Sequence, residues 1–313
     1  MKIAKKLLSE LLTIFLISLF VFFIFQVIPG DPVLSQLGSE EIQQNPALAE
    51  KLRLEFNLDQ PPVQRFFTWV ANVLQGDLGT SFKFKVPVAT MIKNNFKPTI
   101  VLTILSMFLT IVIAIPLGIS VGKRREEGSQ VFSNVLSQLG LAIPQFWLAI
   151  VLIGIFSLKL KLFPTRALVD FSQPAATLKS LILPVVTLSL GNISLVTRYL
   201  LNSISDEKNK AYVTYAKAKG LTDEELLNKH ILKNSMIALV TVLGLTIIGM
   251  LTGSILVENI FNIQGLGSLM INAIADNDYP LVQGLVLIYS IIVVLVNTIL
   301  DIIYAKIDPR ISL

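Results

Sequence analysis

Few residues of this chain are of a type that performs covalent chemistry. The sequence contains no cysteine and a single histidine, His230. Disulfides, thiolate ligands and cysteine nucleophiles are therefore excluded, and no histidine cluster is present for a zinc or haem site. His230 lies between Lys229 and Lys233 with no carboxylate beside it in the sequence, which favours a structural or partner-contact role over a metal or proton-relay role. We expect no catalytic, cofactor-binding or metal-binding residue.

Two further classes of ligand are disfavoured by what the sequence lacks. No phosphate-binding loop of the pattern Gly-x-x-x-x-Gly-Lys-Ser/Thr occurs, so the chain is not expected to bind a nucleotide by that means. The net charge of +5 does not indicate nucleic-acid binding, because the lysines and arginines lie between apolar runs rather than in one basic stripe with aromatic side chains.

A polar stretch at about residues 203–235 is predicted to form a helix, a tight turn and a second helix. Gly220 supplies the positive φ with which many helices end. Thr222 and Glu225 have the spacing of a capping box, which starts the next helix. An ordinary connector whose lysines rest on an anionic leaflet is the alternative interpretation. The residues singled out here are Ala211, Tyr212, Tyr215, Ala216, Lys219, Gly220, Leu221, Thr222, Glu225 and His230.

The composition places most of the chain in a lipid bilayer. Hydrophobic residues make up 53% of the sequence and charged residues 15%, which leaves too little polar surface for a soluble globule. A helix needs about 20 apolar residues to cross the bilayer. We therefore predict an all-α membrane protein of six transmembrane helices, in which Pro144 ends or kinks the third. The six apolar segments are residues 7–28, 99–121, 135–158, 181–201, 236–257 and 281–304.

Basic residues predict the orientation of these helices. Clusters before the first segment, after the second, between the fourth and fifth, and after the sixth all fall on one side of a six-pass topology, so both termini are predicted to be cytoplasmic. The loop after the third segment departs from this trend. The first segment resembles a secretory signal but is long and lacks a small-residue cleavage site, so we expect it to remain as a helix.

Two segments are predicted on the opposite, outer side. The loop at residues 29–98 is rich in aromatic side chains at partly helical spacing and is expected to be ordered. The segment 261–278 contains Gly265 and Gly267 ahead of an amphipathic run. Together with Asp278 and Tyr279 it is interpreted as an outer gate or docking site, with a simple interfacial connector as the alternative.

A pathway across the membrane has four candidate residues. Gly249 and Gly253 form a small-residue face on the fifth helix, for which close helix packing is favoured over open space along a path. Asn192 lies deep in the fourth helix, and Asn297 lies one turn from Asp301 on the sixth. Hydrogen bonding between helices is the more common use of such asparagines.

Several motifs together carry a family resemblance. Residues 214–221 (Thr-Tyr-Ala-Lys-Ala-Lys-Gly-Leu) and 229–234 (Lys-His-Ile-Leu-Lys-Asn) resemble the "EAA" loop of ABC importer permeases, in its peptide and nickel transporter variant. Thr214 and Tyr215 replace the Glu-Ala of the general pattern, and Ala238 replaces a proline common in relatives. In order and spacing, the chain resembles the first of the two permease subunits of dipeptide, oligopeptide or nickel importers. Further matching motifs lie at residues 28–32, 58–61, 76–79, 115–118, 143–146, 278–284 and 308–310.

The resemblance implies an ABC importer type I permease fold in the bacterial cell membrane. Residues 1–98 would form a helix with a long extracytoplasmic loop, residues 99–305 a five-helix core containing the coupling loop at about 203–235, and residues 306–313 a cytoplasmic tail. The implied partners are a homologous second permease, two ABC ATPase subunits and an extracytoplasmic solute-binding protein. ATP and Mg would be used by the ATPase subunits, with no cofactor bound by this chain and no nucleic acid as partner.

The implied cargo is a di- or oligopeptide, with a nickel chelate as the alternative within the same family. An ATP-independent channel or secondary transporter is a rival from another class. A coupled carrier should have ionisable residues near the membrane midplane and inverted repeats, and an intramembrane enzyme should have a catalytic pair. Neither pattern is found in the sequence.

Overall fold

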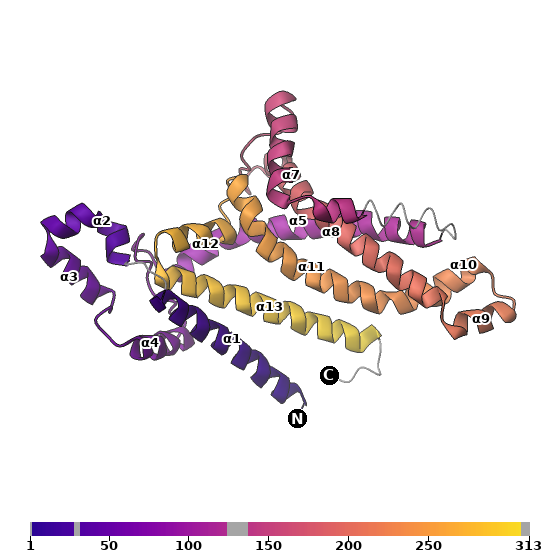
Figure 1. Cartoon of the computed structure of the whole chain (residues 1–313), viewed down its shortest axis with the longest axis horizontal. Helices are drawn as coiled ribbons and strands as arrows, with labels where there is room; N and C mark the ends of the chain where they lie inside the picture. The colour runs from indigo at the N-terminus through magenta and orange to yellow at the C-terminus, as the bar shows by residue number, and fades with distance from the viewer. Residues whose placement is uncertain (1, 28–31, 124–136, 308–313) are drawn as a thin grey trace. The chain divides into compact units, whose positions relative to one another are not determined.

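The structure is a computed structural model that describes residues 2–27, 32–123 and 137–307 of the chain. These residues form helices joined by turns and loops, with no strand named among them (Figure 1). The α-helices are α1 (Lys2–Val27), α2 (Pro32–Gln44), α3 (Pro46–Glu55), α4 (Pro62–Leu74), α5 (Val88–Lys123), α7 (Gln145–Leu152), α8 (Pro174–Lys208), α9 (Ala211–Ala218), α10 (Asp223–Leu226), α11 (Leu232–Ile260), α12 (Leu266–Ala275) and α13 (Tyr279–Ile307).

Five helices of the described residues are long and apolar enough to cross a membrane. Four predicted segments, 99–121, 181–201, 236–257 and 281–304, lie wholly inside α5, α8, α11 and α13. The first lies inside α1 except for residue 28, which is outside the described residues. The all-α membrane fold predicted from composition is confirmed. Both α5 and α8 extend beyond their apolar runs, which hydropathy alone does not reveal.

The third predicted segment is not one continuous helix. Residues 137–142 are helical, the helix stops at Ile143 and Pro144, and it resumes as α7 and the π-helix η1 (Ile153–Lys159). Pro144 has ψ 133 and precedes the first residue of α7. Proline has no backbone N–H and disfavours the helical region for the residue before it, so the interruption falls where the sequence places this residue. The count of six spans is thus approximate: five long helices and one broken apolar segment.

The chain divides into two compact units. Unit 1 contains Met1–Lys97 and Gln264–Leu295, and unit 2 contains Pro98–Ile263 and Val296–Leu313. Both α5 and α13 pass from one unit into the other. This division by contacts differs from the predicted boundaries at 98/99 and 305/306, which follow membrane topology and stay a prediction.

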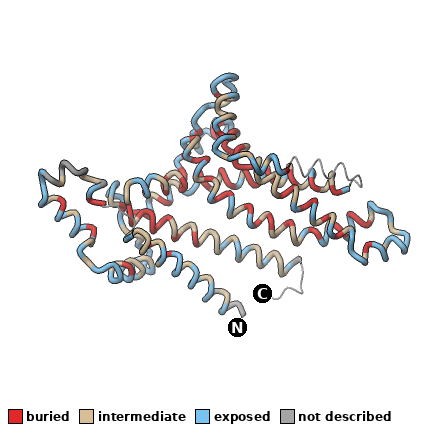
Figure 2. The backbone as a smooth tube through the Cα atoms, in the orientation of Figure 1, coloured by how far each residue is buried: buried red, intermediate tan, exposed pale blue. Residues whose placement is uncertain are grey.

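In unit 2, α8 and α11 pack side by side over much of their length (Figure 1). Buried positions recur along both helices (Figure 2). Close approach of α5 to α8 depends on two glycines, because a Cβ at Gly118 would lie 2.9 Å from Leu200 Cδ2 and one at Gly122 would lie 3.0 Å from Ile204 Cδ1. Small residues of this kind permit tight packing between membrane helices.

In unit 1, α4 packs on α1 through aromatic rings. Phe66, 1% exposed, lies 5.6 Å from Phe15 and 5.3 Å from Phe22 between ring centroids. A second cluster joins α12 and the first turns of α13 to Val88 and Ile92 at the start of α5. The predicted order of the loop 29–98 is reflected in α2, α3 and α4.

Candidate functional site

The segment between α8 and α11 has the helix–turn–helix form that the sequence predicts. The chain leaves α8, forms α9, turns at Gly220 with φ +89 and enters α10, whose N-cap is Thr222. A positive φ is unfavourable for residues with a Cβ, so the turn requires glycine here. The second helix continues from α10 through the π-helix η2 (Leu227–Ile231) into α11 without a loop.

A complete capping box fixes the start of α10. Thr222 Oγ1 accepts from the Glu225 N–H at 3.3 Å, and the Glu225 carboxylate accepts from the Thr222 N–H at 3.1 Å. Lys229 pairs with the same carboxylate at 3.2 Å, and Lys217 pairs with Asp223 at 3.2 Å across the turn. The box satisfies donors that a helix start leaves without partners.

Buried apolar side chains attach this segment to α8 and α11. Val213 on α9 and Leu226, Leu227 and Ile231 are all buried. They pack against Ile204 of α8 and other buried residues of the same cluster. The segment from α9 to η2 is therefore attached firmly to the ends of α8 and α11.

A polar cluster around Glu207 joins α8, α9 and α11. Glu207 is 8% exposed and forms an ion pair with Lys210. It accepts a hydrogen bond from the Tyr212 hydroxyl at 2.8 Å, and Asn234 donates to that hydroxyl at 3.1 Å. Burial and then the bond to Glu207 raise the pKa of Tyr212 above its ordinary value, so the phenol remains a donor at neutral pH. Sequence reasoning missed Glu207, whose only signal is an acidic residue within a basic stretch.

One face of the segment remains open to solvent. Tyr215 is 63% exposed, and Lys219 Nζ lies 4.6 Å from the centroid of its ring. Of the ten residues predicted in this segment, six are exposed and four are partly buried. The exposed ones are Ala211, Tyr215, Lys219, Gly220, Thr222 and His230, and the partly buried ones are Tyr212, Ala216, Leu221 and Glu225.

The predicted outer-gate residues lie within unit 1 in a packed environment. Asp278 is fully buried and accepts from the Ser81 hydroxyl at 2.5 Å and from the Phe82 N–H at 3.0 Å. Gly265 is the N-cap of α12, and both Gly267 and Tyr279 are buried. Asp278 thus ties the loop before α5 to the start of α13, which is a structural task.

The four predicted pathway residues are only partly brought together. Asn192 lines a cavity of about 270 Å³ that Gln145 also lines, and its side chain donates to its own helix at Leu188 O, 2.7 Å away. A Cβ at Gly253 would lie 3.2 Å from Gln145 Oε1, whereas one at Gly249 would meet nothing within 4 Å. Asn297 is exposed on α13. Packing therefore explains Gly253 but not Gly249.

A buried carboxylate in unit 2 has no counterpart among the predicted residues. Glu258 near the end of α11 is 0% exposed and accepts a hydrogen bond from the Thr99 hydroxyl at 2.7 Å. It lies two residues before the end of α11, where a charged residue is the ordinary sign of a membrane border, so the sequence did not single it out.

Comparison with known proteins identifies relatives along nearly the whole chain. The family described as "Binding-protein-dependent transport system inner membrane component" matches residues 114–313, and the family of its N-terminal part matches residues 2–103. The glutathione transport system permease protein GsiC of Escherichia coli (strain K12) is 34% identical over 309 residues, which are 99% of this chain and 98% of that protein. A Brucella ovis protein whose name describes a peptide permease is 34% identical over 301 residues, covering 95% and 94%.

A solved structure shares the fold. The MetNI methionine ABC transporter in an inward facing conformation contains a chain that superimposes with a TM-score of 0.57 at 17% identity. The match covers 70% of this chain and 97% of that one.

Proposed function

This chain belongs to the family of inner membrane components of binding-protein-dependent transport systems, and from that premise we propose that it forms half of the membrane pathway of a peptide importer. It is a permease subunit of an ABC importer and not itself an enzyme, because in this family separate subunits hydrolyse ATP. It resides in the cytoplasmic membrane and crosses it several times.

The observation that carries the mechanism is the firm attachment of α9 and α10 to α8 and α11. A partner ATPase that binds the exposed face at Tyr215 and Lys219 would move both α8 and α11. The force would be transmitted because Val213, Leu226 and Ile231 of the segment are buried against these helices. Alternating access by such rigid-body movement requires an exposed segment that is fixed to the moving helices. The two ATPase subunits would take up ATP and Mg, and this chain would bind neither.

The remaining partners and the cargo follow from the same premise. A homologous second permease would supply the other half of the pathway, and an extracytoplasmic solute-binding protein would deliver the cargo. Relatives named for peptide and for glutathione support a di- or oligopeptide. A nickel chelate is the alternative. The described residues contain no group of three or more metal-ligating side chains, although cargo choice in such systems can reside in the binding protein.

Site-specific cross-linking tests the coupling surface. Because this chain has no cysteine of its own, Tyr215→Cys gives it a single position for a photoreactive maleimide in native membranes. We expect illumination to join this chain to an ABC ATPase identified by mass spectrometry. Leu168→Cys, at a residue 74% exposed in the loop before α8, is the matched control and should capture no ATPase. Capture only of a second copy of this chain from both positions would contradict the proposal and favour a stand-alone channel.

The cargo is tested by uptake into proteoliposomes. The co-purified importer with its binding protein should accumulate a labelled dipeptide in an ATP-dependent manner and should not accumulate nickel. ATP-dependent nickel uptake without peptide uptake would select the alternative cargo.

A further inference from the structure

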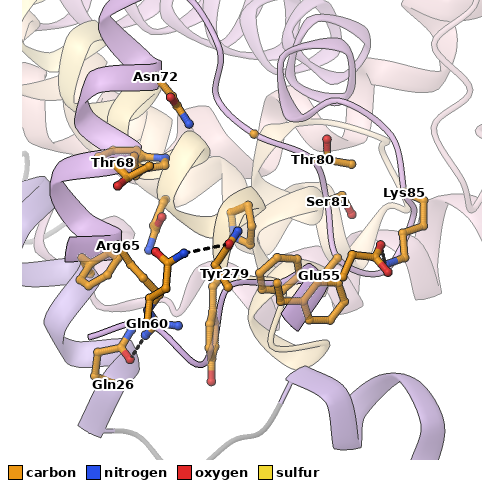
Figure 3. A pocket seen from close by; sticks show the side chains of 18 residues that line it. Gln26, Glu55, Gln60, Arg65, Thr68, Asn72, Thr80, Ser81, Lys85 and Tyr279 are labelled. Atoms are coloured by element: carbon orange, nitrogen blue, oxygen red, sulfur yellow. Dashed lines mark hydrogen bonds and ion pairs between the residues drawn. The ribbon is translucent and has the colours of Figure 1, made fainter. Parts of the chain in front are cut away.

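A cavity of about 490 Å³ in unit 1 has no role in the function proposed above. Its walls are the last turns of the α1 span, the end of α3 with the turn at 56–60, the polar side of α4, the loop at 79–85 and the start of α13 (Figure 3). Its size is within the range of cavities that hold small molecules.

Two buried donors beside this cavity have no partner within the described residues. Arg65 Nε and Trp69 Nε1, both on α4 and both on side chains that line the cavity, are hidden from solvent and make no hydrogen bond there. Buried N–H groups are rarely left without an acceptor, and each such group calls for a ligand, an ion or water. Since both groups donate and neither accepts, the fitting ligand presents acceptor oxygens.

The charge of the cavity selects an anionic ligand. Lys85 is already paired with Glu55 at 2.9 Å, whereas Arg65 forms its hydrogen bond with the neutral side chain of Gln26. Burial lowers the pKa of Arg65 below its ordinary value, with smaller opposing effects from Tyr279 and Asp59. A phosphate offers several acceptor oxygens to a guanidinium and would compensate its buried charge.

The surroundings identify the source of that phosphate as lipid. Phe22 and Gln26 belong to the last part of the apolar span Leu8–Val27 of α1. On α4, Val63, Phe67 and Leu74 are 56%, 58% and 84% exposed and follow helical spacing. An amphipathic helix with an exposed apolar stripe, an arginine and a tryptophan is typical of a membrane interface.

We propose that Arg65 and Trp69 bind the phosphate of an anionic phospholipid head group at the membrane interface. This interface belongs to the outer leaflet, and only that choice of leaflet rests on the proposed function. The acyl chains lie along the apolar stripe of α4, and the head group occupies the cavity between α4 and the start of α13. The lipid fixes α4 to α1 in unit 1.

Native mass spectrometry of the delipidated full-length chain, titrated with phosphatidylglycerol, tests this assignment. Arg65→Gln should weaken binding of one phosphatidylglycerol about tenfold, because it removes a charge-assisted hydrogen bond to the phosphate. Trp69→Phe should weaken it about fivefold by removing a single neutral donor. The matched control Arg53→Gln deletes the same charge at an exposed residue of α3 that does not line the cavity, and it should leave the affinity unchanged.

Three further measurements keep the outcome decisive. Thermal unfolding of each variant identifies loss of fold, and Arg65→Lys should restore part of the affinity that Arg65→Gln loses. Equal phosphatidylglycerol binding by all variants would overturn the proposal. So would displacement of the lipid by inorganic phosphate, which would assign the cavity to a soluble anion, or by dialanine, which would assign it to a peptide. Because no ATPase is needed, this result is independent of the coupling experiment.

Discussion

At the scale of single residues, Glu207 is the centre of the polar contacts that join α9 to α8 and α11. We expect Glu207→Gln to lower uptake several-fold at unchanged membrane level, because the charged partner of Lys210 and Tyr212 is lost while the side chain keeps its size. Hydrogen bonds to a charged group contribute about 1.5–3 kcal/mol, against about 1 kcal/mol for neutral ones. Transport into proteoliposomes alongside ATPase activity measures the effect.

The control is Glu224→Gln, which removes an exposed carboxylate from the same segment and should leave uptake unchanged. Tyr212→Phe should give a smaller loss than Glu207→Gln. The raised pKa of Tyr212 gives its contribution a defined pH range: it is fully present below the ordinary tyrosine pKa of about 10 and is lost only as pH rises beyond that. Wild-type uptake in both glutamate variants would remove Glu207 from the coupling mechanism.

At the scale of elements, we expect alanine substitution to have opposite effects on stability at two glycines of α11. A Cβ at Gly244 would overlap the side chain of Leu300 on α13, whereas one at Gly249 would meet nothing within 4 Å. We therefore expect Gly244→Ala to destabilise the protein by about 1–3 kcal/mol through overpacking. Gly249→Ala, the matched control, should be neutral or slightly stabilising because alanine favours helix. Thermal unfolding in detergent measures both.

A third variant tests whether the open face belongs to the pathway. Gly249→Leu should leave the unfolding temperature near that of wild type but reduce uptake if the face at Gly249 borders the cargo. Full uptake with Gly249→Leu would remove this glycine from the proposed path, and an equal loss of stability in both alanine variants would contradict the packing described for α11 and α13.

The elements themselves were predictable because their causes are local. Apolar length marks the long helices, proline explains the break at Pro144, and the Gly220 turn with the Thr222 capping box follows from neighbouring residues. Contacts between distant segments were not predictable. Nothing in the sequence pairs Thr99 with Glu258, or Asp278 with Ser81, because only the packed fold brings such groups to one place. The buried donors of α4 escaped notice for the same reason.

At the scale of the whole molecule, the placement of charge predicts on which side of the membrane each loop lies. Lysine-rich loops stay in the cytoplasm, so the α9–α10 segment should lie there. The loop before α8 is basic too, but it is separated from that segment by the single span of α8 and should therefore lie on the opposite side. In the cysteine-free chain, we expect Leu168→Cys to react with a membrane-impermeant maleimide in intact spheroplasts. Ala218→Cys, also exposed, should react only after the membrane is opened. A mass shift on a gel detects the labelling of either variant. Labelling of Ala218→Cys in sealed spheroplasts would reverse the predicted orientation. It would also contradict the assignment of the ATPase-coupling surface, because the ATPase subunits bind ATP in the cytoplasm.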